Sequence, residues 1–175
     1  DRVLVEKKAH RLTLFRNNRP LKSYAIALGR QPEGPKRFQG DNKTPEGRYV
    51  IDSRKRGSAY HRALHISYPS PDDAAFAAKQ KRSAGGDVMI HGLPNGMGSL
   101  GKLHLLRDWT AGCIAVTNAE IEEIWRAVPD GTPIEIRPVR DRLEAVLADL
   151  PPPLYVAGSV VSREQLGDHD VKRLL

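Results

Sequence analysis

The sequence has one cysteine, few aromatic residues and no long hydrophobic run. The single cysteine, Cys113, excludes an internal disulfide and a metal site built from several cysteines. It is therefore either a buried structural thiol or a reactive one. No run of about eighteen apolar residues occurs, so we expect no membrane-spanning helix. We also predict no signal peptide within this chain, and a trimmed, exported form that starts at Asp1 is compatible with that prediction.

Aromatic residues make up 6% of the chain, whereas its formal net charge is +7. A positive charge favours an anionic partner, such as nucleic acid, a membrane surface or a polymer rich in carboxylates. Proteins that bind nucleic acid interleave aromatic side chains with Lys and Arg or carry a basic recognition helix. The basic residues here are scattered, so we expect no nucleic-acid partner. A solvated basic surface is the plain alternative explanation of the charge.

Alternating apolar and polar residues predict strands over most of the chain up to residue 138. The strand-like segments are 2–8, 10–17, 20–29, 48–53, 63–69, 85–92 and 132–138. The first three of them predict an antiparallel meander. Capping residues followed by helix formers predict helices over 70–82 and 117–128, in the second of which either Thr117 or Asn118 can be the cap. The pattern predicts a mixed, β-rich α+β fold.

The length of 175 residues fits one domain with an appendage. We place the domain at residues 1–138. Residues 139–175 contain a predicted helix over 139–150, a run of prolines and a tail, which we expect to pack on the same domain or to extend it. A long loop over 30–47, rich in Gly, Pro, Asn and Lys, is expected near the functional site.

Cys113 has the neighbours that a reactive thiol needs. A helix predicted to start at Thr117 and a histidine at a strand end, His91, can each stabilise or generate a thiolate. Gly112 lets the backbone bend sharply, so that main-chain N–H groups can converge on an oxyanion. From these residues alone, a buried structural cysteine is an equally good interpretation.

Two other motifs point to metal or cofactor chemistry but lack the context for it. His61 and His65 lie four residues apart, yet the segment is extended and no glutamate completes a zinc-protease pattern. We interpret the pair as lining a site or lying on the surface. The segment GMGSLG at 96–101 matches a dinucleotide fingerprint, but its candidate helix is too short to cross to a second strand. We predict no metal and no organic cofactor.

Three ordered motifs resemble the catalytic domain of the L,D-transpeptidases, the YkuD-type family of bacterial cell-wall enzymes. They are KTPEGRYVI, MIHG and TAGCIAV, and the resemblance covers roughly residues 1–138. The matching positions are Thr44, Pro45, Glu46 and Gly47 in the first motif and His91, Gly92, Thr110, Gly112, Cys113 and Ile114 in the other two. The resemblance implies a β-sandwich with a few short helices around the active site.

The resemblance also implies a mechanism. Cys113 is the nucleophile and His91 the base, and the resulting thioester forms at an L,D bond next to diaminopimelate in a peptidoglycan stem peptide. The N–H groups of Gly112 and Cys113 are expected to hold the oxyanion. Thr110 either supports this loop or is a small polar turn residue. The expected substrate contacts are Gly92, Arg107, His61 and His65, with Lys102 and Arg82 as further candidates or as solvated charges.

The sequence departs from the family pattern at two polar positions. Ala111 stands where many members have a second histidine, and Ala115 where many have Asn or Arg. His91 and Cys113 are separated by 22 positions, which enlarges the glycine-rich loop. The segments DWTAGCIAV at 108–116 and LHISYP at 64–69 most resemble those of a branch with hydrolytic members that cut amide bonds to diaminopimelate.

These departures leave the type of reaction open. Hydrolysis or exchange of small groups, L,D-cross-linking, and a non-catalytic peptidoglycan-binding module with the same fold are the three alternatives. The resemblance implies work in the periplasm or cell envelope, acylation by carbapenems, and peptidoglycan stem peptides as partners. A protein linked to peptidoglycan is a further candidate partner.

Overall fold

The structure is a computed structural model, and it describes residues 1–139. The tail, with nearly all of the helix predicted over 139–150, lies outside the described residues. The division of the chain into a catalytic domain and a C-terminal extension therefore stays a prediction.

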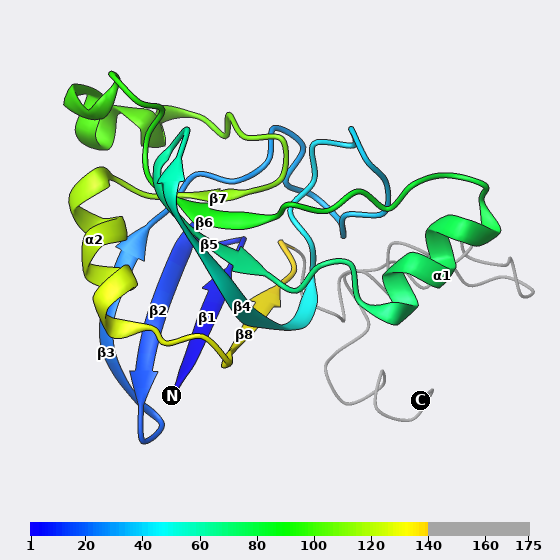
Figure 1. Cartoon of the computed structure of the whole chain (residues 1–175), viewed down its shortest axis with the longest axis horizontal. Coiled ribbons are helices and arrows are strands. Elements are labelled where there is room, and N and C mark those ends of the chain that lie inside the picture. Colours follow the sequence, from blue (N-terminus) through cyan, green and yellow to red (C-terminus); the bar gives the residue numbers. More distant parts are fainter. Residues whose placement is uncertain (140–175) are drawn as a thin grey trace, which may run out of the picture. The chain divides into compact units, whose positions relative to one another are not determined.

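The described residues form eight strands, two α-helices and one 3-10 helix (Figure 1). The strands are β1 (Arg2–Glu6), β2 (Arg11–Arg16), β3 (Arg19–Ala25), β4 (Gly47–Ser58), β5 (His61–Ile66), β6 (Met89–His91), β7 (Ile114–Ala115) and β8 (Thr132–Arg137), and the helices are α1 (Pro71–Lys79), η1 (Gly98–Leu106) and α2 (Asn118–Ala127). The predicted β-rich α+β class and both predicted helices are confirmed. Strand β7 is too short to show the two-residue alternation from which we predicted the other strands.

All eight strands belong to one sheet with the order β3-β2-β1-β8-β4-β5-β6-β7. The meander β1-β2-β3 is antiparallel, as predicted, and β8 returns to pair with β1 in parallel. The chain that leaves β3 then pairs with the opposite edge of the sheet, because Ala27 and Ala115 exchange two backbone hydrogen bonds of 3.0 and 2.9 Å. The sandwich expected from the resemblance is thus one sheet curled on itself.

The curled sheet buries one hydrophobic core. Strand β8 shows the alternation clearly, because Thr132, Ile134 and Ile136 are buried whereas Glu135 and Arg137 are not. Helix α2 packs against β5 and β6 and buries Ile121 and Ile124. Each fully buried isoleucine stabilises the fold by about 2 kcal/mol, so this helix is firmly attached to the strand that carries His91.

Both α-helices begin with a capping box. The Ser70 hydroxyl accepts from the N–H of Asp73 at the start of α1, and the Thr117 hydroxyl accepts from the N–H of Glu120 at the start of α2. The sequence allowed either Thr117 or Asn118 as the cap of α2, and in the structure Thr117 is the cap. The side chain of Asn118, the first residue of α2, is left to bond elsewhere.

The long loop that follows β3 is fastened to the sheet by a buried lysine. The Lys7 ammonium donates to the carbonyl oxygens of Gly34 and Thr44 at 2.9 and 3.0 Å and pairs with Glu46 at 2.8 Å. Burial lowers the pKa of Lys7, although the Glu46 carboxylate opposes the shift. The Gly29 N–H also donates to the Thr44 hydroxyl at 3.0 Å. These bonds give the loop a fixed path across the end of the sheet.

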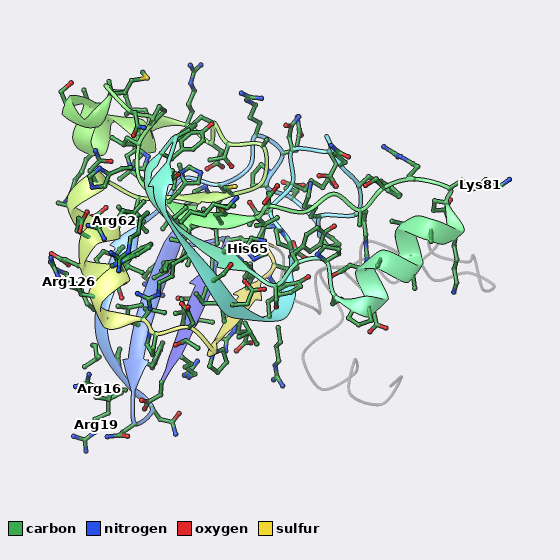
Figure 2. All side chains as sticks on the ribbon, viewed as in Figure 1. Arg16, Arg19, Arg62, His65, Lys81 and Arg126 are labelled. Carbon is green, nitrogen blue, oxygen red and sulfur yellow. The ribbon has the colours of Figure 1, made fainter. Side chains whose placement is uncertain are left out.

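The basic side chains are spread over the described surface. Figure 2 shows Arg16 and Arg19 at the β2-β3 hairpin, Lys81 beyond the far end of α1, and Arg62 and Arg126 near α2. Of the labelled cations, Arg62 pairs with Glu122. Within residues 1–139, no helix is long and apolar enough to span a membrane.

Candidate active site

Parallel pairing of β6 with β7 brings His91 and Cys113 together. Ile90 pairs with Ile114 and His91 with Ala115, so Cys113, one position before β7, lies beside Met89. Because side chains alternate along a strand, Cys113 and His91 share one face, two positions apart in register. The Val116 N–H donates to the His91 carbonyl at 3.0 Å and continues this pairing. Residues 22 positions apart in sequence thus become neighbours in space.

The Cys113 thiol is partly exposed and donates to the Asp87 carbonyl oxygen at 3.5 Å. Burial raises the pKa of this thiol above its ordinary value. The Met89 N–H and the Lys36 ammonium act in the opposite direction, and the Asp87 carboxylate adds to the increase. The resting thiol is therefore protonated at neutral pH and needs a base.

The His91 ring is buried, with 3% of the residue exposed, and its tautomer is set by the backbone. Nδ1 donates to the Gly92 carbonyl oxygen at 2.7 Å, which leaves Nε2 without a proton. Burial lowers the pKa of His91, the bond to Gly92 opposes this effect, and nearby His104 adds to it. His91 is therefore neutral at pH 7 and is a base. The Tyr60 and Trp109 rings pack on it, with centroids 4.4 and 5.8 Å away.

No hydrogen bond joins His91 to Cys113 among the residues that the structure describes. Catalytic hydrogen bonds are often long in a protein without substrate and shorten when the substrate binds. The two side chains share one face of the sheet, and each is bonded to a backbone carbonyl.

The loop before Cys113 is held in a tight and unusual path. Gly112 has φ of +135°, and a Cβ atom there would lie 2.6 Å from the Lys43 carbonyl oxygen, so only glycine fits. The Thr110 hydroxyl donates to the Cys113 carbonyl at 2.7 Å and accepts from the Gly112 N–H at 3.1 Å. Two N–H groups were expected to hold an oxyanion. The N–H of Gly112 is already bonded to Thr110, whereas the N–H of Cys113 has no hydrogen-bond partner among residues 1–139.

Cys113 lies at a cavity of about 500 Å³ that three loops enclose. The lining residues outside the cysteine loop are Lys36, Gln39, Gly40, Ser83, Gly85, Gly86, Asp87 and Val88. The Gln39 N–H donates to the Ser83 carbonyl at 2.9 Å, and Gly85 allows the two loops to pack closely. We refer to this space as the Cys113 cavity.

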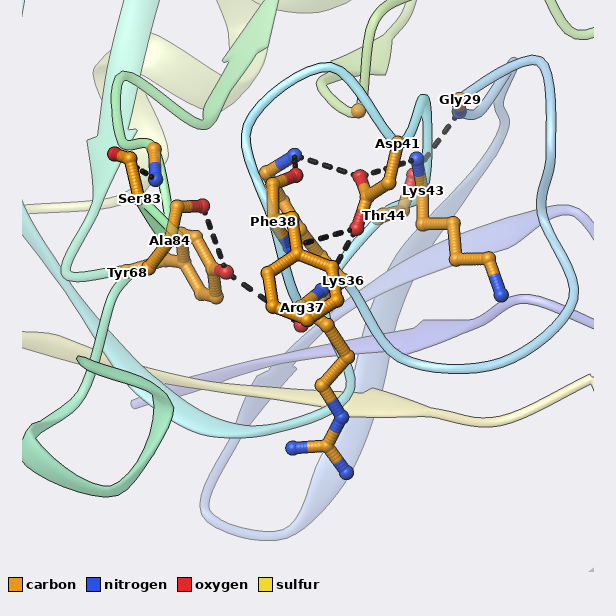
Figure 3. Close-up of polar contacts among 12 residues, drawn as sticks. Gly29, Lys36, Arg37, Phe38, Asp41, Lys43, Thr44, Tyr68, Ser83 and Ala84 are labelled. Carbon is orange, nitrogen blue, oxygen red and sulfur yellow. Dashed lines mark hydrogen bonds and ion pairs between the residues drawn. The ribbon is translucent and has the colours of Figure 1, made fainter. Parts of the chain in front are cut away.

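Asp41 organises the loop that supplies Lys36 to the Cys113 cavity (Figure 3). Its carboxylate accepts from the Lys36 ammonium at 2.8 Å and from the N–H groups of Arg37, Phe38 and Lys43 at 2.8, 2.9 and 3.1 Å. Burial acts to raise the pKa of Asp41, but these donors outweigh it and lower the pKa. Lys36 is buried and its charge is already paired when it faces Cys113.

A second hollow, an apolar groove of about 550 Å³, begins at Trp109, one of the two aromatic residues that pack on His91. It is lined by Leu93, Pro94, Met97, Leu100, Leu103, His104, Leu106, Arg107 and Trp109. Its residues Leu103 and Leu106 are 64% and 83% exposed. The buried Nε2 atom of His104 has no hydrogen-bond partner among the described residues, whereas Nδ1 accepts from the Trp109 indole at 3.4 Å.

The other residues predicted to bind substrate do not line the Cys113 cavity. The His61 ring bonds to the Glu122 carboxylate and the His65 ring to the Asp52 carboxylate, and neither histidine lines the Cys113 cavity, which agrees with the surface interpretation of the pair. Arg107 borders the apolar groove instead. Gly92 has a packing role, because a Cβ atom there would lie 2.7 Å from Asn118 Oδ1.

The two further candidate cations also lie outside the Cys113 cavity. The Arg82 guanidinium stacks on the Phe38 ring at 3.8 Å from its centroid, and Lys102 is an exposed residue of η1. Among residues 1–139, no three His, Cys, Asp or Glu side chains are placed to hold a metal ion.

Sequence reasoning missed several residues of the site. Tyr60, Trp109 and Asp87 contact His91 or Cys113, and the sequence analysis gave none of them a role in the site. Lys36 was noted only as part of a basic loop. Asn118 was noted only as a candidate helix cap, although its position a few residues after the cysteine was the available signal.

The sequence model of the YkuD family, described as the L,D-transpeptidase catalytic domain, matches residues 1–136. The chain belongs to this family. The resemblance of the three motifs is thereby confirmed, and the family places the chain among L,D-transpeptidase domains.

Relatives with solved structures or curated names agree with the family. The chain is 34% identical over 111 residues to the Escherichia coli K12 protein named "Putative L,D-transpeptidase YafK", an alignment that covers 62% of this chain and 37% of that protein. It is 30% identical to YkuD of Bacillus subtilis 168, which bears the same designation, over 77% of this chain and 64% of YkuD. The chain thus spans little more than a third of YafK and less than two thirds of YkuD.

The crystal structure of the helical cell shape determining protein Pgp2 from Campylobacter jejuni has the same fold. It superposes with a TM-score of 0.60 at 25% identity and covers 82% of this chain and 50% of that one. The chain thus shares its curled sheet with Pgp2, whereas its membership of the L,D-transpeptidase family comes from the sequence match.

The unpartnered Nε2 of His104 leads to a stability prediction. Burial lowers the pKa of His104 in the folded protein. As the pH falls, the imidazole is therefore protonated near pH 6.5 in the unfolded chain but only at a lower pH in the folded protein. His104 therefore destabilises the fold increasingly as the pH falls below about 6.5. His104→Phe removes the unsatisfied buried Nε2 atom but also the acceptor of the Trp109 indole, so we expect a small effect on the melting temperature at pH 7.5 and a stabilising effect as the pH falls.

The gain from His104→Phe should be larger at pH 5.5 than at pH 7.5, and thermal denaturation at the two pH values measures it. His10→Phe, at a half-exposed histidine paired with Asp108, is the matched control and should show no such gain. An equal or smaller gain at pH 5.5 contradicts the prediction.

Proposed function

We propose that this domain is a cysteine-dependent acyltransferase or hydrolase that acts on peptidoglycan stem peptides at an L,D bond next to diaminopimelate, through a thioester on Cys113. The observation that carries the proposal is the placement of the only cysteine of the chain on the same sheet face as His91, whose Nε2 is free of a proton. Membership of the family supports the class of substrate.

The proposed reaction begins from a neutral pair. As the substrate carbonyl approaches, His91 Nε2 takes the thiol proton, and a new bond forms from Sγ to the carbonyl carbon. The Cys113 N–H stabilises the oxyanion in this proposal. The amide C–N bond then breaks, the amine leaves with the proton held by His91, and the acyl group remains on sulfur. Water or a second amine finally attacks the thioester and regenerates the thiol.

We further propose that hydrolysis, or exchange of small groups, is faster than cross-linking. Cross-linking requires an acceptor stem held firmly enough for its amine to outcompete water. Ala111 lines the cavity without a polar group, and the backbone of Ala115 is bonded within the sheet to Ala27. Lys36, the cation of the basic loop that lines the cavity, is already neutralised by Asp41. These contacts favour the hydrolytic alternative over L,D-cross-linking.

The proposal implies a place and partners for the protein. Its substrate lies outside the cytoplasm, so we propose a periplasmic or cell-envelope location. A stem peptide carrying a lysine-linked peptide, as in a protein attached to peptidoglycan, is the partner that a hydrolytic enzyme of this kind would release. No metal or organic cofactor enters the proposed reaction.

A non-catalytic peptidoglycan-binding module is the alternative of a different class. The raised pKa of Cys113 is compatible with such a module, since the thiol is not ionised at rest. The free Nε2 of His91 and the glycine-only path before Cys113 favour the enzyme. Turnover of muropeptides decides between the two.

Loss of the thiol should abolish the reaction without loss of the fold. Cys113 is partly exposed, so Cys113→Ala and Cys113→Ser should change the melting temperature little while abolishing turnover of purified muropeptides, followed by mass spectrometry. A carbapenem adduct seen by intact mass on the unmodified protein should be absent from both variants. Unchanged turnover in Cys113→Ala rules out the thioester.

Loss of the base should change the pH profile of the thiol. His91→Ala should slow alkylation of Cys113 by iodoacetamide at pH 7, because the neutral His91 no longer accepts the proton. The difference should disappear only above the ordinary thiol value of about pH 8.5, since burial raises the pKa of Cys113.

The acid side of the same profile tests the low pKa of His91. Because burial lowers that pKa, the advantage over His91→Ala should persist below pH 6.5, the ordinary value for histidine. His61→Ala and His65→Ala are the controls, because both rings pair with surface carboxylates. Identical profiles for His91→Ala and the unmodified protein would leave His91 a structural residue.

The products identify the acceptor. We expect a disaccharide tetrapeptide to be trimmed or left uncoupled, and a stem with a lysine-linked peptide to release that peptide, because the cavity offers few contacts to an acceptor stem. Mass spectrometry with and without excess diaminopimelate-containing acceptor measures this. Cross-linked dimers as the main product overturn the preference for hydrolysis and leave Cys113 and His91 in place.

A further inference from the structure

One peptide unit next to His91 carries a hydrogen bond at each end. Its carbonyl oxygen, from Gly92, accepts from His91 Nδ1 at 2.7 Å. Its N–H, from Leu93, donates to Asn118 Oδ1 at 2.8 Å. The C=O and N–H of a trans peptide point in opposite directions, so the two bonds form a chain from Asn118 to the His91 ring. Each bond in such a chain polarises and strengthens the other.

We propose that Asn118 is the positioning residue for His91 and fixes its tautomer and ring orientation through the Gly92–Leu93 peptide. This inference rests on the proposed function, in which His91 is the base. Asn118 touches neither the thiol nor the imidazole, so its effect passes through the peptide unit. It fills the place of the group that orients a catalytic histidine.

The position of Asn118 is unusually well fixed. Thr117 and Glu120 form the capping box of α2, so the Asn118 side chain is not used as a helix cap. Two glycines make room for its amide. A Cβ atom at Gly92 would lie 2.7 Å from Oδ1, and one at Gly98 would lie 2.7 Å from Nδ2. The loop after β6 therefore packs directly around this amide.

A neutral partner suits the base proposed for this site. A carboxylate bonded directly to Nδ1 would favour the imidazolium and raise the pKa of His91. The chain from Asn118 holds the Nδ1 proton without adding a charge, and it leaves Nε2 free to accept. Among the described residues, Gly92 is the only hydrogen-bond partner of His91 Nδ1.

Two substitutions separate the acceptor from the bulk of the side chain. Asn118→Leu keeps the size and removes the acceptor, so the His91 ring should populate both tautomers in nitrogen-15 NMR spectra. Alkylation of Cys113 at pH 7 should then fall by about tenfold, as is typical when an orienting partner is removed. Asn118→Asp keeps an acceptor oxygen but adds a negative charge, so it should retain the Nδ1–H tautomer and raise the pH at which His91 titrates.

A double-mutant cycle distinguishes positioning from general structural support. In the His91→Ala background, Asn118→Leu should slow alkylation no further, because its effect requires the imidazole. Asn95→Leu is the matched control, since the Asn95 side chain accepts from the His61 N–H and donates to the Ser58 carbonyl, and among the described residues it makes no hydrogen bond to Gly92 or Leu93. It should leave the tautomer of His91 and the alkylation rate unchanged.

The outcomes for Asn118 and for the proposed function differ. An unchanged His91 tautomer in folded Asn118→Leu, or equal losses of rate with and without His91, overturns the role of Asn118. If Asn118→Leu does not fold, Asn118→Asp decides, and an unchanged His91 titration overturns the proposal. If His91→Ala alone leaves alkylation unchanged, the base in the proposed function fails, whereas the NMR spectra still report whether Asn118 fixes the ring.

Discussion

The parallel pairing of β6 with β7 is the constraint on which the site depends. It sets Cys113 and His91 on one face of the sheet, although the glycine-rich loop and η1 separate them in sequence. Strand β7 has only two residues, so its position relies on its other neighbours. Backbone bonds from Ala115 to Ala27 close the sheet on that side, and helix α2 follows directly. The site is thus built where the curled sheet meets itself.

Burial gives the proposed catalytic pair its character. It lowers the pKa of His91 and raises that of Cys113, so both groups are neutral at rest. A thiolate paired with an imidazolium would need stronger compensation than the Met89 N–H and the paired Lys36 supply. In the proposed reaction a protonated thiol and a neutral imidazole are the starting pair, and proton transfer is coupled to attack on the substrate.

The supports of the site come from separate parts of the chain and meet through backbone groups. Asp41 gathers its own loop around one side of the Cys113 cavity, and Thr110 holds the turn before the cysteine. Asn118 reaches the loop after His91 from the start of α2. Each of these side chains bonds to main-chain N–H or C=O groups rather than to the reacting atoms. The fold therefore fixes the geometry of the site mainly through its backbone.

The strands with clear alternation, both capped helices and the motifs that contain Cys113, His91 and Gly112 could be predicted from the amino-acid sequence, because periodicity, capping and glycine requirements are local. The sequence also raised the choice between Thr117 and Asn118 as helix cap, which only the structure resolved in favour of Thr117. The tertiary contacts could not be predicted in this way. They pair His61 and His65 with carboxylates away from the Cys113 cavity, and they bond the Gly112 N–H to the Thr110 hydroxyl. They also place Lys36 opposite Cys113 with its charge already paired by Asp41. Those contacts join residues from different strands and loops or depend on how a loop folds back, and a linear pattern cannot reveal which partner a polar side chain finds across a curled sheet.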